Sequence, residues 1–215
     1  MPRTLLASIA LTLAAGAAFP APPATREAAL AALENPVTER RAEAVVWVAN
    51  HGRMEDTELL LKRLRHDDSP FVRGYAERGL WLLWSRSGDG DIDRAMARGV
   101  EQMEAGQSAG AIATFSDVIR RRPAFAEGWN KRATAYYLAG EYRKSLADCD
   151  EALKRNPRHF GALSGYGQIY FKLEEFDQAI AWWRRALEVN PNMLGVEINI
   201  RNTEQLLKQK RGRST

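Results

Sequence analysis

From Thr25 to Ser85, apolar residues recur with the spacing of amphipathic helices, and short polar segments interrupt them. Thr25 is a residue type that caps helix N-termini, and Pro70 suits the first turn of a helix. The pattern therefore predicts two helical hairpins within residues 25–88. Their four helices are expected at Arg26–Glu34, Val37–Ala49, Glu55–Arg65 and Phe71–Ser85.

The following hundred or so residues repeat with a period of 34. Small or short apolar residues return at the eighth, twentieth and twenty-seventh positions of each segment, and proline returns at the thirty-second. A fixed period of this length is typical of stacked helix–turn–helix units. The three segments are Ile92–Phe125, Ala126–His159 and Phe160–Met193. The sequence therefore predicts an all-α fold.

The repeated positions resemble those of the tetratricopeptide repeat (TPR). The middle segment carries Trp129, Ala133, Tyr136, Gly140, Tyr142, Ala152 and Pro157. The third carries Leu163, Gly167, Tyr170, Phe176, Ala179, Trp183, Ala186 and Pro191, and the first carries Ala95, Gly99, Gly106, Ala111, Phe115 and Pro123. The resemblance implies a right-handed α-solenoid of three TPR units. Glu127–Ala133 and Pro157–Gly165 are also similar to segments of small exported bacterial TPR proteins.

Two features depart from the TPR pattern. Cys149 stands at the twenty-fourth position of the middle segment, where a large ring is usual, and its small thiol leaves room for neighbouring Tyr or Trp rings. After Met193 the pattern is lost. Residues 194–211 are expected to form a capping helix with a polar outer face, followed by a disordered tail at residues 212–215.

The two N-terminal hairpins are also related at a spacing of 34, since Pro36, Ala42, Glu43 and Trp47 recur as Pro70, Ala76, Glu77 and Trp81. The segment Asp68–Arg73 resembles HEAT repeats, in which Asp and Arg of neighbouring units form a ladder. The sequence leaves open which Asp takes part, and the equivalent Arg of the first hairpin, Arg40 or Arg41, has no clear Asp before it. A degenerate TPR pair is the alternative.

The segment Ser87–Asp91 is the predicted break between the hairpins and the repeats, and Asp91 or Asp93 is expected to cap the next helix. At the other end, Arg3 precedes an apolar run at Leu5–Phe19, and small residues and prolines follow.

This order predicts a secretory signal peptide and Pro-rich linker at residues 1–24, with cleavage between Ala17 and Ala24. The protein is then expected to be exported to the periplasm, with no membrane span after cleavage. An N-terminal membrane anchor is the alternative, although the apolar run is shorter than the ~20 residues of a spanning helix.

Composition excludes several functions. The net charge is +4, but the 31 basic and 27 acidic residues are well mixed, so no nucleic-acid partner is expected. His51, His66 and His159 have no second His or Cys at ligand spacing, and Asp89–Val100 lacks the glycine and glutamate of a calcium loop. The only cysteine, Cys149, has no nearby base. No metal, cofactor or enzymatic activity is predicted.

In TPR proteins the first helix of each unit lines a concave groove. Carried over to this sequence, the resemblance implies a groove with polar residues for a peptide backbone and rings as apolar anchors. The predicted groove residues are Met103, Asn130, Lys131, Thr134, Tyr137, Ser164, Gln168, Phe171, Asn199 and Asn202. The predicted function is a non-catalytic scaffold that binds a protein or peptide. The alternative is an assembly or regulatory subunit of an envelope enzyme or transporter that acts through the N-terminal hairpins. The sequence does not predict the oligomeric state.

Overall fold

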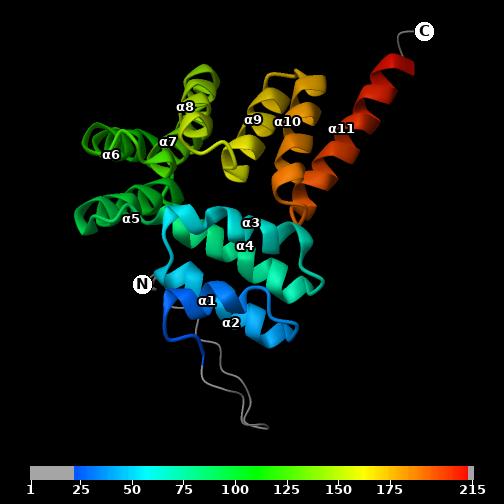
Figure 1. Cartoon of the computed structure of the whole chain (residues 1–215). Helices are drawn as coiled ribbons and strands as arrows, with labels where there is room; N and C mark the ends of the chain where they lie inside the picture. Colours follow the sequence, from blue (N-terminus) through cyan, green and yellow to red (C-terminus); the bar gives the residue numbers. More distant parts are fainter. Residues whose placement is uncertain (1–21, 213–215) are drawn as a thin grey trace. The chain divides into compact units, whose positions relative to one another are not determined.

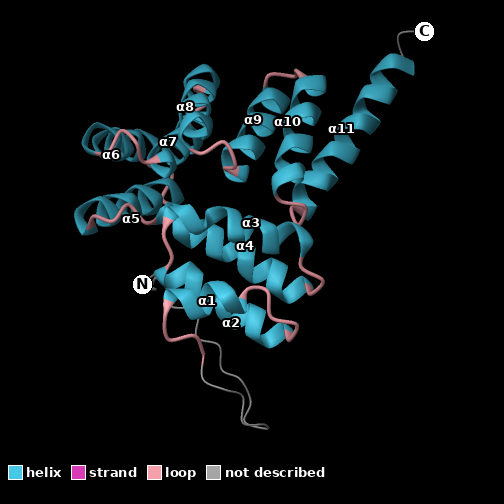
Figure 2. Cartoon of the chain, viewed as in Figure 1, coloured by secondary structure: helices cyan, strands magenta, loops and turns pink. Residues whose placement is uncertain are grey.

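The computed structural model of the chain describes residues 22–212, and within this range it is all-helical with no strand (Figure 2). This confirms the predicted fold class. The predicted signal peptide lies almost wholly outside the described residues, as do residues 213–215 of the predicted tail. The chain forms two compact units, one ending at Leu83 and the other beginning at Trp84.

The N-terminal unit is built from two hairpins (Figure 1). Its helices are α1 (Arg26–Ala32), α2 (Thr38–His51), α3 (Thr57–His66) and α4 (Pro70–Ser85), with a 3-10 turn, η1 (Met54–Asp56), before α3. Thr25 caps α1, since its hydroxyl accepts the Ala28 N–H at 3.2 Å. Aliphatic side chains of α2, α3 and α4 are fully buried and form the core of the unit: Val45, Val48, Leu60, Leu61, Leu64 and Leu80.

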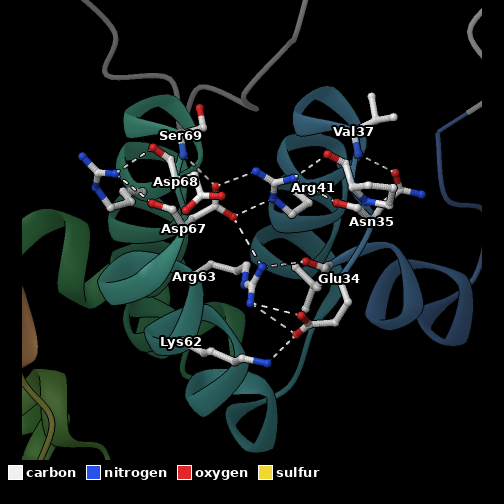
Figure 3. A network of polar contacts seen from close by, with 12 residues as sticks. Glu34, Asn35, Val37, Arg41, Lys62, Arg63, Asp67, Asp68 and Ser69 are labelled. Carbon is white, nitrogen blue, oxygen red and sulfur yellow. Dashed lines mark hydrogen bonds and ion pairs between the residues drawn. The ribbon is translucent and has the colours of Figure 1, made fainter.

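A buried polar network joins the two hairpins (Figure 3). Arg41 on α2 donates two hydrogen bonds to the carboxylate of Asp67, which follows α3, at 2.7 and 2.9 Å. Arg63 on α3 lies 3.4 Å from the same carboxylate and 3.2 Å from Glu34. Burial would raise the pKa of Asp67, but the hydrogen bonds from Arg41 and the Ser69 amide hold it below its usual range.

These contacts decide the pairing that the sequence left open. The ladder carboxylate is Asp67, whereas Asp68 is exposed. Its partner is Arg41, because Arg40 pairs with Glu43 on its own helix at 2.6 Å. An Arg of one hairpin thus binds an Asp of the next, which is the arrangement that the HEAT resemblance implies.

The second unit contains three further hairpins and a final helix. They are α5 (Gly90–Glu104) with α6 (Ser108–Arg121), α7 (Ala126–Leu138) with α8 (Tyr142–Arg155), α9 (Phe160–Lys172) with α10 (Phe176–Val189), and α11 (Leu194–Gly212). The final helix packs on α10. Its outer face is not wholly polar as predicted, since Leu194 and Ile198 are exposed.

The turn before α5 differs from the prediction in its capping residue. Asp89 is the N-cap, and its side chain accepts the N–H groups of Asp91 and Ile92 at 2.8 and 3.3 Å. Asp93 instead accepts hydrogen bonds from the amide and hydroxyl of Ser87. The helix therefore begins at Gly90, earlier than a cap at Asp91 or Asp93 would allow.

Glycines let the two helices of a hairpin approach closely in the first and third repeats. A Cβ atom on Gly99 would lie 2.5 Å from the ring of Phe115, and one on Gly167 would lie 2.2 Å from the ring of Trp183. Both rings are buried. Each ring therefore occupies the space that a larger residue at the glycine would need.

Candidate functional site

A cavity of about 260 Å³ lies among α7, α8 and α9, on the side where the first helices of the second and third repeats face the predicted groove. It is lined by Asn130, Ala133, Thr134, Tyr137, Ser145, Cys149, Gly161, Ser164, Gly165, Gln168 and Ile169. None of these residues is charged, so the cavity suits a neutral group.

Five of the ten predicted groove residues line this cavity, namely Asn130, Thr134, Tyr137, Ser164 and Gln168. Asn130 is held in place, since it is buried and its amide donates to Glu127 at 3.0 Å. Thr134 is exposed, and its hydroxyl donates to the Asn130 carbonyl at 3.1 Å. The structure thus brings together polar side chains from the first helices of two neighbouring repeats.

The other five predicted residues lie away from the cavity. Lys131 is 3.3 Å from the Glu127 carboxylate, and Phe171 packs against Phe176 and Trp183. Met103 is partly buried against the core formed by α5 and α6, while Asn199 and Asn202 are on α11. Lys131 is therefore partly neutralised by Glu127.

The cavity lining also includes small or buried residues outside the ten predicted binding residues, although Gly161 and Gly165 fall on groove positions of the repeat pattern. They are Ala133, Ser145, Cys149, Gly161, Gly165 and Ile169. All of them except Ile169 are small, and they come from α7, α8 and α9. Cys149 was expected to leave room for neighbouring rings, but part of that room stays open as the cavity.

Cys149 and Ser145 give the cavity wall no reactive group. The pKa of the Cys149 thiol is raised to about 12 by burial and by the nearby Asp148 and Asp150 carboxylates, so the thiol stays protonated near neutral pH. The Ser145 hydroxyl is already used, since it donates to the Ala133 carbonyl at 2.7 Å. Neither side chain is placed as a nucleophile.

A buried pair that sequence reasoning missed connects the walls of the groove. His159 precedes α9, and its Nδ1 atom accepts the Ala162 N–H at 3.2 Å, which caps that helix. Its Nε2 atom lies 2.8 Å from the carboxylate of Glu127 on α7. Because Nδ1 accepts the Ala162 N–H, Nε2 carries the ring hydrogen and donates a hydrogen bond to Glu127. The pair therefore fixes the start of α9 against α7.

Glu127 remains ionised at this buried position. Burial would raise the pKa of its carboxyl, but the hydrogen bond from His159 and the ammonium of Lys131 hold the pKa below its usual range. Neither His159 nor Glu127 lines the cavity. The pair acts on the groove by positioning α7 and α9. The sequence signal was a histidine at the N-cap position of the third repeat's first helix, 32 residues after an acidic residue.

The described residues contain no group of three or more His, Cys, Asp or Glu side chains that could hold a metal ion. In residues 22–212, no helix combines the length and apolar character needed to cross a membrane.

The geometry defines an α-helical repeat protein with an uncharged cavity between the first helices of two repeats. The profile of the tetratricopeptide repeat family matches residues 96–152 and 132–193. Residues 96–193 are thus tetratricopeptide repeats.

Among similar proteins, a TPR repeat-containing protein of Rhizobium etli is 31% identical over 141 residues, covering 66% of each chain. A tetratricopeptide repeat protein 36 homolog of Nematostella vectensis is 33% identical over 75 residues, which are 34% of this chain and 41% of that protein. The chain thus spans less than two thirds of the length of these relatives. The first TPR of Spaghetti (RPAP3), bound to the HSP90 peptide SRMEEVD, superimposes with a TM-score of 0.52 at 23% identity, covering 54% of this chain and 93% of that one.

Proposed function

We propose that the protein is a non-catalytic scaffold that binds an extended segment of a partner protein in the groove of its TPR array. The observation that carries this proposal is the uncharged cavity, whose polar lining comes from both neighbouring first helices. Asn130, Ser164 and Gln168 present amide and hydroxyl groups that can hydrogen-bond a peptide backbone. The Spaghetti (RPAP3) TPR, which has the same fold, is bound to a peptide.

A second candidate surface lies on the N-terminal hairpins. Phe71 is 75% exposed and Val37 is 44% exposed. They occupy equivalent positions, 34 residues apart, near the starts of α4 and α2. Exposed apolar side chains at repeated positions favour the alternative in which these hairpins bind the partner of an envelope assembly.

The groove is tested with Thr134→Arg combined with Gln168→Arg, which places two long cations at its rim. Partner protein captured from envelope extract by the full chain is expected to fall at least tenfold, because these side chains block the segment and desolvating them is costly. The matched control is Ala147→Arg, at an exposed position of α8. Capture that survives the groove variant but is lost with Val37→Asp and Phe71→Asp would establish the N-terminal hairpins as the binding surface.

The bacterial envelope is the proposed location, and the order of residues from Met1 to Ala24 supports it. Mass spectrometry of the protein from fractionated cells is expected to find a new N-terminus between Ala17 and Ala24, in the periplasmic fraction. An intact N-terminus in the membrane fraction would establish the anchor instead, and an intact Met1 in the cytoplasm would contradict export.

A further inference from the structure

The cavity occupies the place where the other two repeats carry a ring. The residue at the twenty-fourth position is Phe115 in the first repeat and Trp183 in the third, and both side chains are buried. In the middle repeat the same position is Cys149, which lines the cavity. A thiol is much smaller than a ring, so this repeat lacks the volume that its neighbours contain.

The eighth position shows the same difference. Gly99 and Gly167 lie against the rings of their own repeats, whereas the middle repeat has Ala133, which lines the cavity. One methyl group does not replace an aromatic ring. Two small side chains therefore face each other, and the space between them stays open on the groove side.

The third repeat places no bulky side chain over this part of the cavity. Gly161 and Gly165 on α9 line the cavity and present no side chain to it. A Cβ atom on Gly165 would lie 3.6 Å from the Cys149 sulfur, so this glycine stands directly over the thiol. At about 260 Å³ the cavity is larger than the ~150 Å³ apolar cavity that is known to hold a benzene molecule.

We infer that the middle repeat receives one large apolar side chain of the bound segment, aromatic by preference, in the place of the missing ring. This inference rests on the proposed groove function. Ala133, Cys149 and Ile169 form the apolar wall, and the uncharged lining disfavours an acidic or basic side chain. The partner is thus an extended segment with an aromatic anchor, which the polar groups at the rim orient.

The test restores the ring within the protein itself. Ala133→Gly combined with Cys149→Phe reproduces the glycine and ring of the first repeat, while Cys149→Ala keeps the space open as the matched control. The probes are 12-residue peptides selected from a random phage-displayed library on the wild-type full chain, and free indole. Selected peptides are expected to share an aromatic residue at one position and to bind the ring variant ten- to a hundredfold more weakly.

The outcomes separate the pocket from the groove. Peptides that lose binding with Thr134→Arg and Gln168→Arg, yet bind the ring variant normally and share no large apolar residue, would overturn the side-chain pocket and leave the groove intact. If no peptide binds while indole binds the wild type and not the ring variant, the cavity accepts an aromatic ring, but the peptide groove fails, and with it the inference that a side chain of the bound segment fills the cavity. Circular dichroism checks folding, and Gly165→Phe fills the cavity from α9 should the ring variant not fold.

Discussion

Replacing Asp67 with alanine is expected to lower the free energy of unfolding of the N-terminal unit by about 3–5 kcal/mol. Asp67 accepts two hydrogen bonds from Arg41 and lies 3.4 Å from Arg63, and all three residues are buried. Without the carboxylate, the Arg41 guanidinium stays in the interior with no charge to balance it, and Arg63 keeps only Glu34 as an acidic partner. Urea denaturation measures the loss, and amide hydrogen exchange in α2 and α3 assigns it to this unit.

Asp68→Ala is the matched control, one residue further on and exposed. It is expected to change stability by less than about 0.5 kcal/mol. Because the pKa of Asp67 is depressed in the folded state, its stabilisation is present above about pH 4 and is lost as the pH falls further. The Asp67→Ala protein should lack this acid-dependent step. A larger loss from Asp68→Ala would show that the pairing is wrong.

The helices were predictable because each one repeats a local pattern. The α2 helix, for example, was expected at Val37–Ala49 and is found at Thr38–His51. Caps and prolines act on residues close to them in sequence, so the ends of such helices can be predicted from the sequence. The contacts between helices were harder to predict from the sequence. Asp67 and Asp68 are adjacent in sequence, and only the path of the turn after α3 decides which carboxylate meets Arg41.

The candidate site shows the same limit in another form. Polar residues such as Asn130 and Gln168 could be selected from the repeat pattern, because the pattern says which helix faces the groove. The cavity beside them depends on volume that is missing at Ala133 and Cys149. A motif lists the residue types that are usual at each position and does not give the volume that a smaller residue leaves empty. That empty volume is found only when Cys149 is compared with Phe115 and Trp183 at the same position of the other repeats.

Gly167→Ala is expected to destabilise the second unit by about 3 kcal/mol, although alanine is the better helix former. The added Cβ would lie 2.2 Å from the Trp183 ring, which is buried and cannot move aside. Trp183→Cys alone should cost about 3–5 kcal/mol, because it leaves a cavity. In that background the same Gly167→Ala change should stabilise the protein by about 0.5–1 kcal/mol, since the clash is gone and the gain in helix propensity remains.

The control for this cycle lies on the same helix. Gly165→Ala adds the same methyl group two residues away, where its nearest neighbour is the Cys149 sulfur at 3.6 Å, an ordinary contact. It should therefore stabilise the unit, in contrast to Gly167→Ala, when both are measured by urea denaturation. Equal changes in the free energy of unfolding at the two glycines would mean that the clash with the Trp183 ring costs little compared with the gain in helix propensity. The opposite signs expected here would show that the Trp183 ring fills the space beside Gly167, which in the middle repeat lies between Ala133 and Cys149.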